Sequence, residues 1–318
     1  MTKKISIKSL YKIFGKDPKK AMEHVQNGIG KDQLLEKHNH VLGLSDINLD
    51  IEDKSIQVVM GLSGSGKSTL IRHINRLIEP TSGSVNVEDQ EITNLDLREL
   101  RDFRRQKTAM VFQKFALLTH KTVLENVSFG LDIQKKDPNE TKNRAMKWID
   151  RVGLARALTN DAVILLMDEA FSALDPLIRK DMQDMLLELQ EELHKTVVFI
   201  THDLDEALKL GDNIAILKDG KMDQEGIPAE IILRPKTEYV RKFVEDVNRT
   251  RVLKAKHIME KINGINTSGA MLVNQEDFLE KFMEKFVQVK PENILVQDDH
   301  KNNKGVITSK RLSEILRK

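Results

Sequence analysis

The sequence predicts an α/β fold with one large domain and a smaller carboxyl-terminal module. Over about residues 42–225, strand-like apolar runs alternate with segments of helical periodicity. Two of the apolar runs, at residues 56–60 and 162–168, lead into a glycine-rich loop and an acidic pair, respectively. A chain of 318 residues has room for two domains, which we place at residues 1–250 and 251–318, because the sequence pattern changes between them.

The composition is that of a globular protein and narrows the range of partners. Hydrophobic residues make up 40% and charged residues 31% of the chain, and 51 basic residues nearly balance 49 acidic ones. This balance argues against a protein that coats nucleic acid. The chain has no cysteine, which excludes disulfides and fits an intracellular location. No apolar run approaches the roughly 20 residues of a membrane span, so we expect no direct membrane insertion.

The amino-terminal segment begins with a strand candidate, and two short helices are expected to follow it. Residues 5–10 alternate between apolar and polar side chains, which favours a strand. A helix is predicted between Asp17, as its N-cap, and Gly28, just past its end. A second, polar helix is expected over residues 31–38.

The later segments complete the alternating pattern. Strand candidates lie at residues 56–60, 107–113, 162–168 and 196–203, and helix candidates lie at residues 70–78 and 176–195. Residues 213–226 predict a β-hairpin with Asp219 and Gly220 at its turn, since this dipeptide favours a two-residue turn.

The glycine-rich loop carries the strongest chemical signal in the chain. GLSGSGKST fits the pattern G-x-x-x-x-G-K-[ST] and lies between a strand candidate and a helix candidate. Glycines let backbone N–H groups turn inward around phosphates, and the helix N-terminus adds its positive dipole. Lys67 can reach the β- and γ-phosphates of a nucleotide, and Ser68 can place its hydroxyl on Mg²⁺. The alternative is a flexible glycine–serine turn. The predicted ATP-binding residues here are Gly61, Leu62, Ser63, Gly64, Ser65, Gly66, Lys67, Ser68 and Thr69.

The acidic pair follows another apolar run, AVILLM. Asp168 is expected at the carboxyl end of a buried parallel strand, where an open α/β sheet presents its ligand-binding groups. A carboxylate there can hold Mg²⁺ through its water shell. Glu169, next to it, can polarise an attacking water. Alone, such a pair is an ordinary strand end, but after a phosphate-binding loop it indicates nucleotide hydrolysis.

In this order, the motifs resemble the ATPase subunit of ATP-binding cassette (ABC) transporters over roughly residues 5–245. MVFQKFALLTHKTVLENV is similar to the family's Q-loop region, with Gln113 as the loop glutamine. TVVFITHDLDEAL supplies His202 as the histidine that senses the γ-phosphate. LYKIFGK resembles the segment whose aromatic residue, here Phe14, stacks on adenine. SALD resembles the loop that contacts the other subunit of the dimer, formed here by Ser172, Ala173, Leu174 and Asp175.

The resemblance implies a P-loop NTPase core of the ABC-ATPase type that binds ATP and Mg²⁺ and forms a homodimer. It implies Gln113, Glu169 and His202 as catalytic residues. It also implies Ser68, Gln113 and Asp168 as the residues that hold the metal.

A narrower resemblance concerns the insertion GKDPKKAMEHVQNGIGKDQLLEKHNH, at residues 15–40. It is similar to the amino-terminal insert of ATPases that serve importers of glycine betaine, proline and related quaternary amines. NRLIEPTSG and MDEAFSALDPLIRKDMQ also resemble that subgroup. The resemblance implies a subunit at the cytoplasmic face of the membrane. It would energise import through a transmembrane permease, which receives its solute from a substrate-binding protein.

The family's signature motif, of the L-S-G-G-Q type, is missing between Gln113 and Asp168. RVGLARAL, which follows directly on that motif in related sequences, is fused here to MKWIDRVGL. We interpret this as an internal deletion that shortens the helical subdomain, the alternative being a natural subfamily that lacks the motif. Because the signature supplies N–H and serine groups to the γ-phosphate held by the other subunit, we expect ATP binding to persist and ATP-driven closure and fast hydrolysis to be impaired.

After about Leu253 the chain resembles a CBS module, a small β-α-β-β-α unit often appended to this importer subgroup. KAKHIME and GVITSKRLSEIL match its start and end. The family's ligand-binding pattern G-x-x-T-x-x-D begins here at Gly305 and ends at Arg311, which replaces the acid that would bind a ribose hydroxyl. The tail is expected either to pack on its twin in a homodimer or to sense a ligand.

Two other functions compete with an importer ATPase. One is an ATP-binding but hydrolysis-deficient regulator. The other is an unrelated phosphate-loop enzyme such as a kinase or GTPase. The absence of an N-K-x-D guanine motif and the presence of SALD and ITHD argue against the second.

Overall fold

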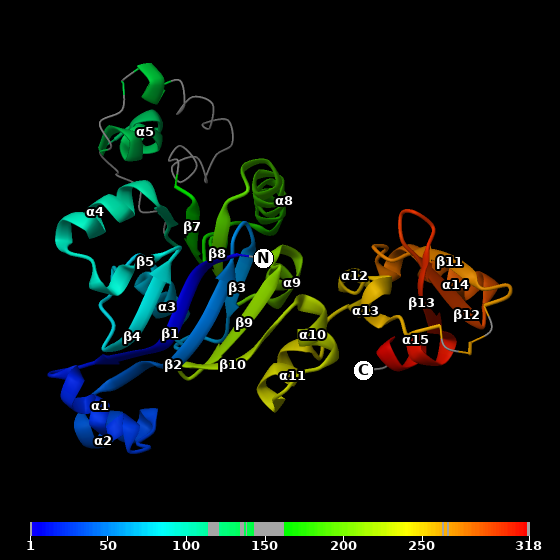
Figure 1. Cartoon of the computed structure of the whole chain (residues 1–318), viewed down its shortest axis with the longest axis horizontal. Helices are drawn as coiled ribbons and strands as arrows, with labels where there is room; N and C mark the ends of the chain where they lie inside the picture. Colours follow the sequence, from blue (N-terminus) through cyan, green and yellow to red (C-terminus); the bar gives the residue numbers. More distant parts are fainter. Residues whose placement is uncertain are drawn as a thin grey trace. The chain divides into compact units, whose positions relative to one another are not determined.

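The computed structural model describes residues 2–113, 121–133, 137, 139–142, 162–262, 264–265 and 267–316. The chain divides into two compact units, Met1–Glu225 and Gly226–Lys318, whose elements are labelled in Figure 1. The domain boundary that we expect after residue 250 remains a prediction.

The first unit contains an antiparallel sheet with the strand order β2-β1-β4-β5 in the described residues. Strand β1 pairs along the whole of β2, from Lys3 opposite Glu52 to Phe14 opposite Val41. The strand candidate at residues 5–10 is therefore part of a longer strand. The strands of this sheet are β1 (Lys3–Phe14), β2 (Val41–Glu52), β4 (Ser82–Val87) and β5 (Gln90–Glu91).

A six-stranded sheet forms the other half of the unit, in the order β10-β9-β3-β8-β7-β6 over the residues described. Strand β3 pairs in parallel with β8 and β9, and β7 pairs in parallel with β6 and β8. The loops that follow β3, β7 and β8 therefore share one edge of the sheet. The strands are β3 (Ile56–Met60), β6 (Thr108–Val111), β7 (Ile164–Asp168), β8 (Thr196–Thr201), β9 (Asn213–Lys218) and β10 (Lys221–Gly226).

Helices connect these strands and cover the sheets (Figure 1). The predicted hairpin is confirmed, since β9 and β10 flank Asp219 and Gly220. The helix predicted over residues 70–78 starts earlier, at Lys67, because Gly66 turns the chain directly into it. The helical segments of this unit are α1 (Pro18–Gln26), α2 (Lys31–His38), α3 (Lys67–Ile74), η1 (Ile92–Asn94), α4 (Leu97–Gln106), α5 (Val123–Ile133), α8 (Pro176–Leu193) and α9 (Leu204–Leu210).

The main core of this unit lies between the two sheets. Side chains from the antiparallel sheet pack with side chains from the parallel sheet and with the apolar face of α3. Burying each large aliphatic side chain contributes about 1.5–3 kcal/mol. Because α3 follows the glycine-rich loop without a break, the packing of α3 fixes that loop against the core. The cluster includes Ile7, Leu44, Val59, Leu70, Ile71, Ile74, Val85, Leu166 and Ile200.

The two predicted amino-terminal helices are present in the insert between β1 and β2. Leu34 of α2 is completely buried, in a cluster with Ile13 of β1 and Leu42 of β2. Asp17 occupies the predicted N-cap position of α1, but its side chain makes no capping hydrogen bond and its φ is 51°. The insert is thus held by apolar packing rather than by its cap.

The second unit contains short helices followed by a small sheet in the order β11-β12-β13. Strands β11 and β12 are parallel, whereas β12 and β13 are antiparallel. From β11 onwards the elements follow the strand–helix–strand–strand–helix order expected for the tail, and its assignment as a CBS module remains a prediction. The elements are α10 (Pro228–Leu233), α11 (Glu238–Val244), α12 (Arg249–Val252), α13 (Ala255–Ile258), β11 (Met271–Asn274), α14 (Leu279–Val289), β12 (Asn293–Gln297), β13 (Asn303–Thr308) and α15 (Ser309–Leu316).

The region where the signature motif is expected lies largely outside the described residues. This applies to residues 114–120 of the Q-loop region and to residues 143–161, which include RVGLARAL. The shortened helical subdomain therefore remains a prediction. Among the helices that are described, none is long and apolar enough to cross a bilayer.

Burial of His73 in α3 makes a pH dependence of stability testable. Burial lowers the pKa of His73 to about 4, although its Nδ1 lies 2.7 Å from the carbonyl oxygen of Thr69. The unfolded chain gains a proton near pH 6.5, whereas the folded chain does so only near pH 4. The folded protein should therefore become less stable as pH falls through this window. Its free energy of unfolding should be about 2 kcal/mol lower at pH 5 than at pH 7.

Urea unfolding at pH 7 and pH 5 measures this loss. His73→Gln should show a smaller decrease between the two pH values than the wild type, because glutamine cannot gain the proton. His194→Gln, at an exposed position, should keep the wild-type decrease. An unchanged decrease in His73→Gln would contradict the assignment.

Candidate functional site

The glycine-rich loop folds tightly between β3 and α3. Gly61, Gly64 and Gly66 have φ values of 148°, 78° and 102°, which favour glycine. A Cβ atom on Gly66 would lie 2.7 Å from the carbonyl oxygen of Gly43, and one on Gly61 would lie 2.2 Å from that of Leu217. The loop therefore needs glycine at both ends to approach β2 and β9 this closely.

Lys67 lies inside the curve of this loop. Its side chain is buried, and Nζ donates hydrogen bonds to the carbonyl oxygens of Gly61, at 2.8 Å, and Leu62, at 3.1 Å. Burial lowers the pKa of Lys67, while the nearby carboxylates of Glu169 and Asp168 act in the opposite direction. Phosphate oxygens are stronger acceptors than neutral carbonyls. The ammonium group therefore fits a phosphate that displaces these two contacts.

Ser68 and Asp168 form a pair of oxygen ligands beside the loop. Ser68 Oγ donates to Asp168 Oδ1 at 2.7 Å, and Arg72 Nη2 donates to Oδ2 at 3.2 Å. Asp168 is buried at the end of β7. Hydroxyl and carboxylate oxygens suit Mg²⁺, which binds few protein groups and takes its other ligands from water and phosphates. The pair therefore fits Mg²⁺ bound together with a nucleotide.

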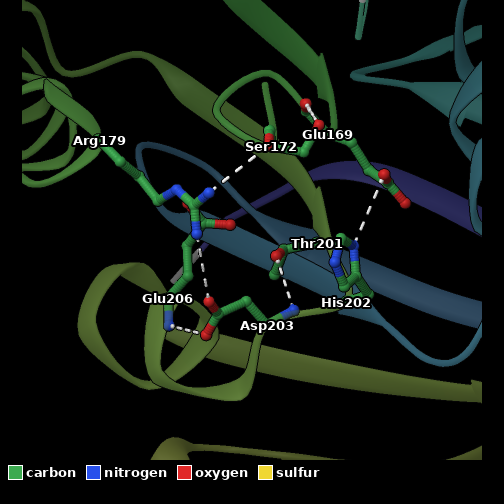
Figure 2. Close-up of a pocket in the computed structure, with 7 residues that line it drawn as sticks. All are labelled: Glu169, Ser172, Arg179, Thr201, His202, Asp203 and Glu206. Carbon is green, nitrogen blue, oxygen red and sulfur yellow. Dashed lines mark hydrogen bonds and ion pairs between the residues drawn. The ribbon is translucent and has the colours of Figure 1, made fainter. Parts of the chain in front are cut away.

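Glu169 brings together the other predicted catalytic residues. Its Oε2 lies 3.1 Å from Gln113 Nε2 and 3.6 Å from His202 Nδ1, the second contact being drawn in Figure 2. Its φ of 48° is unusual for a non-glycine residue and is held by a hydrogen bond from its N–H to the carbonyl of Ile200. Such strain costs about 1–3 kcal/mol and concentrates at functional sites. Gln113 thus contacts Glu169 here, rather than the Ser68–Asp168 pair.

Glu169 and His202 border a small cavity (Figure 2). Its volume of about 30 Å³ suffices for a water molecule or two but not for a nucleotide. Polar and charged side chains dominate its lining. The lining residues are Glu169, Ser172, Arg179, Thr201, His202, Asp203 and Glu206.

The SALD loop begins three residues after Glu169 and is tied to it. Ser172 Oγ donates to the carbonyl oxygen of Glu169 at 2.9 Å. Asp175 is the N-cap of α8, where its Oδ1 accepts hydrogen bonds from the N–H groups of Leu177 and Ile178. Ala173, between them, is exposed. The predicted contact of this loop with a second subunit is untested in a single chain.

Phe14 lies at the end of β1 and is 38% exposed. Its ring packs on Gly43, where a Cβ would lie 2.7 Å from the ring edge. Gly43 in turn contacts Gly66, so the exposed ring is next to the phosphate loop, and Lys12 Nζ lies 5.0 Å from the ring centroid. The remaining loop residues differ in burial: Leu62 and Ser63 are exposed, Ser65 is buried, and Thr69 is part of α3.

The sequence patterns did not reveal two cations at this site. Lys31, from α2, donates to the carbonyl oxygen of Gly64 at 3.2 Å and lies 3.8 Å from Asp219 Oδ1. Its position depends on tertiary packing of the insert, for which the local sequence holds no signal. Arg72, which contacts Asp168, follows Ser68 by one helical turn. Residues four apart lie on the same helix face, so the sequence could have indicated that Arg72 lies beside Ser68.

Comparisons with known proteins agree with this geometry. The family described as ABC transporter matches residues 44–172. The glycine betaine transport ATP-binding protein OpuAA of Bacillus subtilis is 50% identical over 279 residues, covering 81% of this chain and 67% of that protein. The trimethylamine N-oxide transport system ATP-binding protein TmoW of Pelagibacter ubique is 43% identical, covering 98% of this chain and 96% of that protein.

This chain belongs to the ABC transporter ATP-binding family. A solved structure of the dimeric ATP-binding cassette MJ0796, in a post-hydrolysis state with ADP and phosphate, is 30% identical and has a TM-score of 0.60. The match covers 70% of this chain and 98% of the MJ0796 chain. The predicted P-loop NTPase core is thereby confirmed. As an ABC ATP-binding subunit, the chain binds ATP with Mg²⁺, hydrolyses ATP and acts peripherally, together with a membrane permease.

Removal of the Lys67 ammonium tests whether this loop binds the phosphates. Lys67→Ala should weaken Mg-ATP binding by about 10- to 100-fold, because it removes charge-assisted hydrogen bonds to the phosphates. Lys37→Ala, at an exposed position of α2, should bind ATP like the wild type. Isothermal titration calorimetry measures both affinities. Equal affinity in the wild type and Lys67→Ala would overturn the assignment of the loop.

Proposed function

We propose that this chain energises the import of quaternary amines such as glycine betaine or proline through a membrane permease, by binding and hydrolysing ATP. The observation that carries the proposal is the similarity to several transport ATPases named for such solutes. ProV of Escherichia coli, named for glycine betaine and proline betaine, is 46% identical over 83% of this chain. OpuAA and TmoW are named for glycine betaine and trimethylamine N-oxide. These solutes share a methylated nitrogen centre.

The site residues then have separate roles. Phe14 stacks on adenine, and residues 61–69 bind the phosphates, with Lys67 on the β- and γ-phosphates. Bound Mg²⁺ neutralises charge on the phosphates, and Ser68 and Asp168 hold it. These roles are supported by the 2.7 Å contact of Ser68 with Asp168 and by the packing of Phe14 beside the loop.

Glu169 orients the attacking water and accepts its proton, and His202 contacts the γ-phosphate. The 3.6 Å separation of Glu169 and His202 supports their joint action. Gln113 donates to Glu169 in this structure. Its proposed role as a metal ligand requires its side chain to turn from Glu169 toward the neighbouring Asp168.

The proposed partners follow from the same relatives. We place the subunit at the cytoplasmic face of the membrane, bound to a permease that receives its solute from a substrate-binding protein. We also infer a homodimer in which residues 172–175 face the second subunit, supported by the dimeric state named for MJ0796. The solute itself is contacted by the permease and the binding protein, as in other importers of this type.

The proposed internal deletion is supported by the lengths of the comparisons. The comparison with OpuAA runs over 279 residues, whereas 81% of the 318 residues of this chain is about 258, so about 21 residues of OpuAA have no counterpart here. A loss of this size agrees with a missing signature and shortened helical subdomain. The missing motif is also the observation that favours the alternative, an ATP-binding chain deficient in hydrolysis.

The tail is proposed as a CBS-like module at residues 251–318. The β-α-β-β-α order from β11 to α15 supports it. Arg311, where the family pattern has an acid, lies 3.9 Å from Glu314 within α15. A guanidinium group is not a hydrogen-bond acceptor, so this arginine does not replace the acid that would bind a ribose hydroxyl.

Glu169→Gln tests the hydrolytic function. The change keeps the shape of the side chain but removes the proton acceptor, so any phosphate release that the chain sustains should fall to background while ATP affinity changes little. In cells that carry the permease and binding protein of this chain, uptake of labelled glycine betaine should fall in parallel. Turnover at the wild-type rate in Glu169→Gln would show that another residue is the general base. If cells with the wild-type chain did not take up glycine betaine, the proposed solute class would be refuted.

The second functional prediction concerns the missing signature. Glu169→Gln of this chain should be no more dimeric with ATP than without it, because the groups that bind the opposing γ-phosphate are missing. Inserting a family-like signature segment before RVGLARAL should restore an ATP-dependent dimer. Light scattering on both proteins measures the effect. An ATP-induced dimer of the unmodified chain would show that another segment completes the site.

A further inference from the structure

Arg179 connects two loops of the candidate site (Figure 2). It lies in the first turns of α8, and its Nη2 donates to the carbonyl oxygen of Leu174 at 3.1 Å. The same nitrogen approaches the carbonyl oxygen of Ser172 at 3.5 Å. Its other terminal nitrogen, Nη1, lies 3.7 Å from Asp203 Oδ2. One guanidinium group therefore contacts both the SALD loop and the residue after His202.

Asp203 is itself held in place by the start of α9. Its Oδ1 accepts a hydrogen bond from the N–H of Glu206 at 3.1 Å, and its own N–H donates to Thr201 Oγ1 at 3.0 Å. Its second carboxylate oxygen faces Arg179. The chain directly after His202 is thus held by Asp203, whose other carboxylate oxygen lies 3.7 Å from Arg179 Nη1.

Arg179 meets Asp203 where the aspartate side chain is 39% exposed, so the ion pair alone contributes little and the carbonyl contacts of Arg179 matter as well. Its side chain is 30% exposed, and it borders the cavity together with buried Glu206. Burial raises the pKa of Glu206, whose Oε1 accepts from Gln183 Nε2 at 3.0 Å. A planar guanidinium can bind a carbonyl and a carboxylate at the same time, which a lysine ammonium does less well.

We propose that Arg179 is a positioning residue for ATP hydrolysis. The SALD loop follows Glu169 in the chain, and Asp203 directly follows His202. The contacts of Arg179 with Leu174 and Asp203, which we call the Arg179 bridge, therefore lie close in the chain to the two proposed catalytic side chains. Arg179 keeps Glu169 and His202 in position relative to each other without touching the nucleotide. This inference rests on the proposed hydrolytic site and adds a residue to it.

Hydrogen exchange tests the bridge directly. The N–H groups of Ser172 and Leu174 donate to the carbonyls of Glu169 and Phe171, at 3.2 and 3.1 Å, and report on the SALD loop. Arg179→Gln should speed exchange of these two amides by about tenfold, because local opening becomes easier. Asp203→Asn should do the same, since asparagine keeps the cap of α9 but removes the charge that faces Arg179.

The matched control is Lys180→Gln, which removes a neighbouring exposed positive charge from the same helix. It should leave the exchange of both amides unchanged. In Arg179→Gln, strands β3 and β8 should keep their protection and Mg-ATP affinity should stay within about twofold of the wild type, because a positioning residue makes no contact with the nucleotide. Steady-state turnover should fall while the KM for ATP is retained.

Three results would overturn the proposal. The first is unchanged exchange of Ser172 and Leu174 in Arg179→Gln. The second is an Asp203→Asn variant that exchanges like the wild type. The third is a loss of protection that extends through β3 and β8, which would give Arg179 a general role in folding. Each of these results leaves the nucleotide-binding function intact, because that function is decided separately by the affinity of Lys67→Ala.

Discussion

The close approach of Gly66 to Gly43 is the constraint on which the nucleotide-binding face depends. With no side chain at Gly66, and with φ at 102°, the chain passes against β2 and enters α3 at once. The buried face of α3 then anchors the loop in the core between the two sheets. The same contact places Phe14 beside the phosphate loop, since its ring packs on Gly43. One steric requirement thus links the predicted adenine-binding and phosphate-binding elements.

Parallel pairing of β7 with β8 explains why residues far apart in sequence meet at the other side of the site. Asp168 lies opposite Ile200, so the acidic pair and His202 leave the sheet at the same edge. Glu169 then takes a left-handed backbone conformation, and its N–H donates a hydrogen bond to the carbonyl oxygen of Ile200. Its carboxylate contacts His202 and Gln113. The register of the sheet therefore brings the predicted catalytic residues together.

The sequence predicted the elements whose signals are local and left out those that depend on packing. The glycine-rich loop, the apolar run before Asp168 and the Asp219–Gly220 turn carry their signals within a few residues. The full length of β1 was not foreseen, because its pairing with β2 and β4 is long-range and passes through shifts in register. The contacts of Lys31 and Arg179 were also missed. Lys31 joins a helix to a loop that only folding brings near. Arg179 bonds a loop five residues before it, but its contact with Asp203 depends on the fold.

The division of labour within an ABC dimer explains how a chain can keep half of its site while lacking the signature. The partners described for Lys67 and Asp168 come from the two-sheet core of the same chain, and so do the contacts of Glu169 with Gln113 and His202. Their geometry is set by strand register and by the packing of α3, neither of which needs a second subunit. The signature acts on nucleotide held by the partner, so its loss removes donors in trans. Nucleotide binding within one subunit and closure between two subunits therefore depend on different groups of residues.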